Sequence, residues 1–432
     1  MKRKLFFIAV TLSVSIGLLA EPAPRTGFGF GALPAVSFDS DLGFQYGAIV
    51  NLFDYGDGTR FPRYDHSLYL EWSRFTKGSQ TMRIRYDSDR LLPRNIRTTF
   101  DVSYLTDQAM DFFGFNGRQS FFDPDFLNSP FLNFFYKYDQ RMFRAKADFQ
   151  GNIGQSNFGW LAGYTFYNFR LREVQWENLG INPQNTLFRE YMRWGFIRPE
   201  EAEGGKINYF KVGLQYDSRD QFAFPTRGIW TEAALETAPG FVNQLPHTKF
   251  ALIHRQYFTL IPNRMVFAYR LHYQTTIGAN RTPFFMQPML ITSFLTAARA
   301  EGLGGRTSIR GVLRNRVVGD AFALGNFEWR YNFLDFVLWN QNFTLGTNVF
   351  FDTGTILRPI ELNFADIPAT ENQVLDRRFS SREFKHGVFH SAVGAGLKIG
   401  WNQNFVISVD FGKALNEQDG NTGLYIGLNY LF

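Results

Sequence analysis

The sequence of 432 residues contains no cysteine, and after its first 20 residues it has no long apolar run. The missing cysteine excludes a disulfide framework and a thiolate zinc site. The missing apolar runs argue against a helical membrane protein, because a transmembrane helix needs about 20 consecutive apolar residues. Charged residues make up only 19%, but 45% are hydrophobic and 18% aromatic, which excludes intrinsic disorder. What remains is a large, aromatic-rich chain that favours β-strands.

The first 20 residues have the layout of a secretory signal peptide. Basic residues Lys2 to Lys4 precede an apolar run from Leu5 to Leu19, and the small residue Ala20 ends the segment. We expect cleavage after Ala20, with 21–432 exported as one domain; an uncleaved anchor is the alternative. Removing three of the 45 basic residues leaves 42 against 39 acidic ones. This small excess does not indicate binding to nucleic acid.

Apolar and polar residues alternate through most of the remaining chain, a pattern typical of β-strands. In Thr81 to Asp87, Met82 and Ile84 face one side, whereas Arg83 and Arg85 face the other. The same alternation recurs in 144–150, 269–274 and 404–411. A soluble β-sandwich would show this pattern too, so alternation alone does not distinguish a sandwich from a membrane barrel.

Three further features favour a transmembrane barrel. Aromatic residues crowd the strand ends, as at Tyr164, Phe166, Tyr167 and Phe169, which is typical of membrane interfaces. The sequence closes with a strand that ends on Phe432, and the connections are systematically uneven in length. We therefore predict an all-β fold, a 16-stranded antiparallel transmembrane β-barrel.

The predicted strands leave no residues for a second domain. Their approximate limits are 27–38, 43–53, 65–75, 80–88, 96–108, 133–152, 157–171, 207–217, 228–238, 247–261, 265–278, 321–333, 342–357, 387–400, 404–413 and 422–432. The longest connections are 109–132, 172–206, 279–320 and 358–386. All four follow odd-numbered strands, so they lie at one end of the barrel, outside the cell if the chain begins in the periplasm.

Several motifs follow one another in a recognisable order. They are Phe112 to Gly117, Tyr216 to Gly228, Gly304 to Gly311 with its Arg-Gly pair, the strand around Glu328, Phe350 to Gly354 with Asp352, and the last eight residues. Together they resemble the outer-membrane insertase superfamily typified by BamA and TamA, also called bacterial surface antigen proteins. One departure is Val312, where that family usually has an aromatic residue.

The resemblance has four implications. It implies a member that consists of the barrel alone, without periplasmic POTRA domains. It implies an extracellular loop that folds into the lumen, where Arg310 and Gly311 approach Glu328 and Asp352. It implies a lateral seam that opens toward lipid. It also implies a terminal assembly signal, formed by Tyr425, Gly427, Tyr430 and Phe432.

Strand parity leads to the acidic pair independently of the resemblance. Phe327 and Trp329 share the apolar face, so Glu328 points into the lumen, and the same reasoning places Asp352 there. Two enclosed carboxylates repel each other unless a proton or a cation neutralises them. Arg310, on the preceding loop, can donate bidentate hydrogen bonds to them. The alternative is an exposed Arg310, with both acids lining a watery pore.

The first strand is predicted to pair poorly. Gly27, Gly29, Gly31 and Pro34 offer little packing, and proline lacks a ladder donor. Since a closed barrel pairs its first strand with its last, we expect the weakest seam between 27–36 and 424–432, with Leu428 on the far side. The alternative is that these glycines only relieve curvature or crowding.

Catalysis has little support in the sequence. The six histidines show no metal-ligand spacing, and no Gly-x-Ser-x-Gly nucleophile elbow occurs. The glycine-rich stretch from Gly302 to Ser308 lacks the glycine-lysine pair of a phosphate-binding loop. We predict no enzyme activity, no metal and no cofactor.

We expect a protein of the bacterial outer membrane that assists the assembly, insertion or translocation of other proteins, or moves lipid. Its expected partners are outer-membrane lipids and a separate periplasmic or surface protein, but no nucleic acid. A passive channel and a structural or adhesive surface barrel are the alternatives, because a fold does not fix its function.

Overall fold

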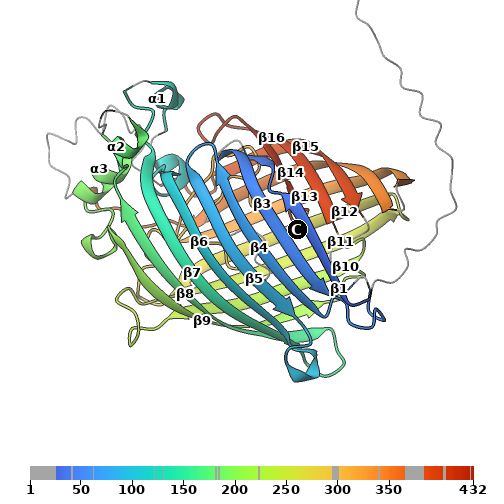
Figure 1. Ribbon diagram of the computed structural model, residues 1–432. Coiled ribbons are helices and arrows are strands. Elements are labelled where there is room, and N and C mark those ends of the chain that lie inside the picture. Colours follow the sequence, from blue (N-terminus) through green and yellow to red (C-terminus); the bar gives the residue numbers. More distant parts are fainter. Residues whose placement is uncertain are drawn as a thin grey trace, which may run out of the picture.

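The computed structural model describes residues 26–39, 42–61, 63–120, 122–129, 131–180, 182, 185–221, 224–293, 301–338, 341–364, 384–401, 405–428 and 430–432. The predicted signal peptide, residues 1–20, lies outside these residues. Each strand pairs antiparallel with its neighbours, and β17 pairs with β2, so that the sheet closes into a barrel (Figure 1).

The strands in chain order are β1 Phe28–Pro34, β2 Ser37–Asp39, β3 Gly43–Asp54, β4 His66–Phe75, β5 Ser79–Ser88, β6 Arg97–Asp111, β7 Lys137–Asn152, β8 Phe158–Arg172, β9 Gly204–Asp217, β10 Gly228–Ala238, β11 His247–Ile261, β12 Met265–Ile277, β13 Ala321–Leu338, β14 Gln341–Arg358, β15 Phe389–Trp401, β16 Phe405–Ala414 and β17 Thr422–Leu428. The short helices are α1 Pro124–Asn128, α2 Trp176–Leu179 and α3 Leu187–Arg193, with 3-10 turns η1 Pro93–Asn95, η2 Gly117–Gln119 and η3 Pro199–Glu201. None of these helices is both long and apolar enough to cross a membrane.

The barrel has sixteen strands, as predicted, because β1 and β2 are two parts of one interrupted strand. Both pair with β3, β1 along its second half and β2 along its first residues. The interruption falls directly after Pro34, which has no N–H to donate to the ladder. The last strand is shorter than predicted: it ends at Leu428 rather than at Phe432.

The two faces of the sheet differ as the alternation predicts. On β13, Trp329 is 46% exposed on the outside, whereas its neighbours Glu328 and Arg330 are buried on the inside. The buried charges of the inner face pair with one another. For example, Arg144 lies 2.8 Å from Asp101 across the β6–β7 ladder. The outer face is therefore apolar, and the inner face is a network of ion pairs.

The long loops and all three α-helices gather at one end of the barrel (Figure 1). There they form an aromatic cluster, which we call the aromatic cap; among its buried members are Phe112, Phe113, Phe115, Tyr136, Phe188, Tyr191, Trp194, Phe196, Phe284 and Phe285. Thr186 caps α3 by accepting a hydrogen bond from the backbone of Arg189, which places Phe188 and Tyr191 within the cluster.

The assignment of one aromatic stretch to the membrane interface needs correction. Tyr167 and Phe169 are buried in the aromatic cap, whereas Tyr164 is exposed on the outside. Side chains of a strand alternate between its faces, so residues with odd numbers on this part of β8 point inward. Only half of the aromatic run can therefore contact lipid.

Candidate lumen cluster and lateral seam

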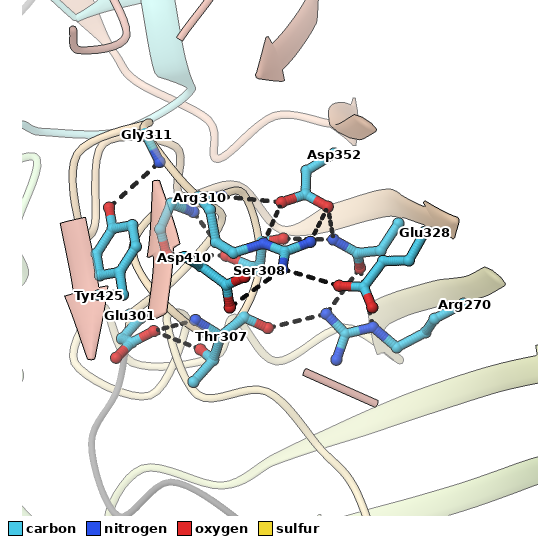
Figure 2. Close-up of polar contacts among 12 residues, drawn as sticks. Arg270, Glu301, Thr307, Ser308, Arg310, Gly311, Glu328, Asp352, Asp410 and Tyr425 are labelled. Atoms are coloured by element: carbon cyan, nitrogen blue, oxygen red, sulfur yellow. Dashed lines mark hydrogen bonds and ion pairs between the residues drawn. The ribbon is translucent and has the colours of Figure 1, made fainter. Parts of the chain in front are cut away.

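Arg310 lies between β12 and β13 and is almost completely buried. Its Nε and Nη2 donate hydrogen bonds of 2.8 and 3.1 Å to the two carboxylate oxygens of Asp352. Its Nη1 lies 2.8 Å from Glu328 Oε1 and 3.5 Å from Asp410 Oδ2. The structure thus brings the three predicted residues together and adds a third acid from β16 (Figure 2). We call these four residues the lumen cluster.

An aromatic ring also packs against the flat face of the Arg310 guanidinium. Its Cζ lies 3.5 Å from the centroid of the Phe350 ring, a close cation-π contact. A Cβ added at Gly394 would lie 2.2 Å from that ring, so only glycine leaves room for it. Asn326 completes the support by donating 2.7 and 2.6 Å hydrogen bonds to Asp352 and to the carbonyl of Ser308.

The charges of the cluster are balanced. Glu328 also accepts a 2.9 Å hydrogen bond from Arg330, and Asp410 accepts two of 2.8 Å from Lys398. Three acids therefore face three cations, which removes the repulsion expected of an acidic pair alone. Burial lowers the pKa of Arg310, but Asp352 and Glu328 raise it more, so its pKa lies above the ordinary value of an arginine. Arg310 is permanently charged.

Backbone contacts press the loop against β16. Gly311 adopts a φ of +105°, and a Cβ there would lie within 2.9 Å of the backbone of β16. A Cβ at Gly412 would lie 2.3 Å from the carbonyl oxygen of Arg310. Gly311 also donates a 3.2 Å hydrogen bond from its N–H to the Tyr425 hydroxyl. Glycine at 311 and 412 is what permits this approach of backbone to backbone.

Two further arginines fix the other side of the same loop. Arg314 donates hydrogen bonds of 2.9 and 2.8 Å to Asp107 and Asp111 on β6. Arg316 donates a 2.7 Å hydrogen bond to the carbonyl of Gly117. Arg310 contacts β14, which is eight strands away from β6 in a barrel of sixteen. The loop therefore spans the barrel from one wall to the opposite one.

The position of Val312 resolves a doubt raised by the sequence. Its side chain is fully buried in an apolar cluster with Leu303, Ile309 and Phe322. A β-bridge between Leu303 and Val317 closes this part of the loop. The loop tip is thus packed without an aromatic residue at this position.

Among the described residues, two pairs join β17 to β2 at the lateral seam. Tyr425 lies opposite Asp39, and Ile426 lies opposite Phe38. The prediction of a seam between 27–36 and 424–432 was therefore wrong in position, because β1 pairs with β3 alone among the described strands. The break after Pro34 separates β1 from the segment that reaches β17.

The glycines near the seam are not explained by crowding. A Cβ at Gly31 would meet nothing within 4 Å, and the same holds at Gly27, which has a φ of +64°. At Gly29 the nearest atom is an ordinary 3.5 Å contact with the Tyr55 ring. Phe28 and Phe30 between them are 91% and 78% exposed. The weak packing of β1 thus leaves one strand edge and two large rings uncovered.

The four residues of the predicted terminal signal lie in two different places. Tyr425 and Gly427 are on the inner face of β17, where a Cβ at Gly427 would displace the Arg306 guanidinium. Tyr430 and Phe432 lie beyond the last strand, which ends at Leu428 and not at Phe432 as predicted. Their rings lie 4.1 and 5.1 Å from the Arg330 Cζ, so they turn toward the inner wall.

Sequence reasoning missed Asp410, a member of the lumen cluster, and Arg270, which contacts the same loop. Asp410 was on the predicted polar face of its strand, but only the fold places β16 near the loop. Arg270 donates a 2.8 Å hydrogen bond to the carbonyl of Thr307, and it too was on a predicted inner face. The repeated Arg at 310, 314 and 316 in one glycine-rich loop was the signal that could have revealed the bridging role.

The closed sheet, with apolar residues outside and ion pairs inside, defines the class of transmembrane β-barrel proteins. Within this class, residues 75–432 match the Omp85 superfamily domain. The chain belongs to the Omp85 superfamily, which places it in the bacterial outer membrane. No protein of curated function matches the sequence.

Two solved structures share the fold. BamA from Haemophilus ducreyi lacking POTRA domains 1–3 superposes with a TM-score of 0.56 at 16% identity, covering 94% of this chain and 70% of that one. CdiB from Escherichia coli superposes with a TM-score of 0.53 at 11% identity, covering 93% of this chain and 63% of that one. This chain thus spans less than two thirds of the length of CdiB.

The described residues contain no group of three or more His, Asp or Glu side chains placed to hold a metal ion. The buried side chain of His390 instead lies 2.8 Å from the Asp419 carboxylate.

Proposed function

We propose that this protein inserts or translocates other proteins at the outer membrane, using its lumen and the seam between β2 and β17. The observation that supports the proposal is the small number of residue pairs at the seam: two in the part of the chain that the structure describes, against thirteen between β8 and β9. Opening a ladder costs free energy for each hydrogen-bonded pair, so the barrel opens most easily at this seam.

The edge of β1 supports the same function. A strand with an unpaired edge is a template for another strand, which adds to it through main-chain hydrogen bonds. β1 is seven residues long and pairs on one side only among the described strands. We propose that a client strand pairs here. A separate periplasmic or surface partner would deliver it, and outer-membrane lipids would receive it.

We call residues 301–320, which lie between β12 and β13 and contact both walls, the bridging loop. This loop argues against a passive channel. Arg310 and Arg314 tie the loop to opposite walls, and the aromatic cap covers its outer side. We propose that the loop stays folded in the lumen and keeps it closed to free diffusion. Client segments would then leave sideways through the seam rather than along an open pore.

A disulfide across the seam tests the proposal. The chain has no cysteine of its own, so Phe38→Cys with Ile426→Cys introduces one opposed pair. The matched control is Leu397→Cys with Val409→Cys, an opposed pair between β15 and β16. Each variant replaces the native protein in cells, and the abundance of other outer-membrane proteins is measured.

We expect the oxidised seam pair to lower that abundance several-fold, and a reductant to restore it. The oxidised control pair should have no effect. An outer-membrane proteome that is unchanged with the seam fully cross-linked would contradict the proposal and favour a channel or a surface-binding barrel.

A further inference from the structure

The outer faces of β7, β8 and β9 carry exposed cations beside the long loops. Outward and buried side chains alternate along each of these strands. Near the loops the outward ones are Arg141 on β7, Arg170 and Arg172 on β8, and Lys206 on β9. Arg170, Arg172 and Lys206 are exposed, and the Arg141 side chain is partly exposed. We call these four residues the basic rim.

The cations of the basic rim lie close together. Arg141 lies directly opposite Arg170 in the β7–β8 ladder. Lys206 is two residues along β9 from Gly204, the residue opposite Arg170. In a ladder the Cβ atoms of opposed residues are about 4.5–5.5 Å apart, and diagonal neighbours are about 7–8 Å apart. Because like charges directly opposite each other destabilise a sheet, this arrangement favours an anion that binds between them.

The acids of the protein do not neutralise the basic rim. Asp139 lies on the same face of β7, and its Oδ2 is 3.7 Å from Arg141 Nη2. Glu173, in the loop beyond β8, pairs instead with an arginine of α3. Among the described residues, no carboxylate lies within 4 Å of Arg170 or Lys206. In this described part of the wall, four cations therefore share one carboxylate, which leaves a surplus of positive charge.

From the rim toward the middle of the wall, the same faces carry amide groups and then aromatic rings. The outward order is Arg170, Asn168, Phe166 and Tyr164 on β8, and Lys206, Asn208 and Phe210 on β9. The Tyr164 and Phe210 rings lie 5.4 Å apart. Asn168 forms no side-chain hydrogen bond with another described residue, so its amide group can bind a ligand. This order of layers matches a lipid, which has a charged headgroup, polar linkages and apolar chains.

The height of the basic rim matches the edge of the membrane. The outward side chains of β8 are apolar or aromatic from Phe158 to Phe166, and ten residue steps separate Phe158 from Asn168. At about 3.3 Å a step and a tilt of about 40°, these steps rise about 25 Å, which is the height of the apolar band of outer-membrane barrels. Arg170 therefore lies at the level of the lipid headgroups on the side of the long loops. This is the outer leaflet in the orientation that we expect from the sequence.

We propose that the basic rim binds the phosphate group of an outer-leaflet lipid. The guanidinium groups donate paired hydrogen bonds to phosphate oxygens, and Lys206 adds a point charge. Asn168 donates to the carbonyl oxygens that link the headgroup to the acyl chains, and the chains lie against the aromatic rings. The phosphate relieves the repulsion between Arg141 and Arg170. The site is on the outer wall, six strands from β2, so it is independent of the seam and of the proposed function.

Lipid binding to the intact barrel tests the site. Native mass spectrometry in detergent measures the binding of dioleoyl phosphatidic acid and of dioleoyl phosphatidylcholine, with inorganic phosphate added as a competitor. The rim variant is Arg170→Gln with Lys206→Gln. The matched control is Arg74→Gln with Lys413→Gln, which removes two exposed cations at the same end of the barrel. Neither of these has a cation opposite it on a neighbouring strand.

We expect the parent and the control variant to bind phosphatidic acid about tenfold more tightly than phosphatidylcholine, because choline screens the phosphate from the cations. The rim variant should lose most of this preference. Arg141→Gln alone should lose part of it, and this single change remains informative if the double variant does not fold.

Three results would overturn the site. One is a rim variant that keeps the full preference, and another is a parent that does not distinguish the two lipids. The third is displacement of the lipid by an equal concentration of inorganic phosphate, which would show that the rim takes the free anion. None of these results depends on a client protein.

Discussion

At the residue scale, Arg310 neutralises the carboxylates that are buried inside the barrel. It alone contacts all three acids, on β13, β14 and β16, while Arg330 and Lys398 each serve one. Removing one partner from a buried ion pair leaves an uncompensated charge, which costs far more than the pair contributes when intact. Within the lumen cluster, we therefore expect the loss of Arg310 to lower the free energy of unfolding most.

Arg310→Ala should lower the free energy of unfolding by about 3 to 5 kcal/mol, because Asp352 and Glu328 lose their shared cation in a buried site. Urea titration of the barrel in phospholipid vesicles measures this change. Arg264→Ala, which breaks a half-exposed 3.6 Å ion pair with Asp335, should cost less than about 1 kcal/mol. Equal effects of the two changes would show that the cluster is wet and that Arg310 is dispensable.

Residue alternation predicted which side chains point inward, since a strand has only two faces. It placed Glu328, Asp352 and Asp410 on inner faces correctly. It could not predict that Asp410 shares Arg310, because that contact depends on the path of a loop through the lumen. The role of Gly412 was hidden for the same reason: the atom it makes room for is 102 residues away in the chain.

At the scale of elements, the strands were predictable and the chain ends were not. The periodic pattern reproduced the sixteen strands within a few residues. It also continued through Tyr430, where the structure leaves the sheet. Local alternation cannot predict that the Tyr430 ring contacts Arg330 and Phe224, because these residues belong to a distant strand and a distant turn.

The connection between β16 and β17 gives a prediction about pH. Burial raises the pKa of Asp419, but hydrogen bonds from His390 and Arg118 lower it more, so its net pKa lies below 3.8. A carboxyl group with a lowered pKa stabilises the fold above its ordinary pKa, and this contribution is lost as the pH falls through the lowered value. The loops that Asp419 joins through His390 and Arg118 should therefore loosen only below about pH 4.

Hydrogen exchange of residues 112–120 and 415–421 between pH 6 and pH 3 measures this loosening. In Asp419→Asn the two segments should exchange faster already at pH 6, with a weaker dependence on pH. If the parent and the variant show the same dependence, Asp419 does not hold these loops together.

At the scale of the whole molecule, the bridging loop and the short seam are complementary features. The loop joins β6 to β14 across the barrel, whereas two pairs among the described residues join β2 to β17. From the proposed function we expect this barrel to exchange material sideways more readily than along its axis.

Conductance in planar bilayers distinguishes these routes. The parent should give small, flickering currents, and the double variant Arg310→Ala with Arg314→Ala should give larger and longer openings, since both walls lose their hold on the loop. A large, stable pore in the parent would instead identify a passive channel.

The most direct test of the account is the protection of backbone amides in the membrane-embedded barrel. Hydrogen exchange should be fastest, among the described strand pairs, at 37–39 and 425–428, because two described residue pairs close the sheet there. The thirteen pairs between β8 and β9 should exchange orders of magnitude more slowly. Equal protection at these two places would mean that the barrel has no weak side, and the proposed lateral route would be wrong.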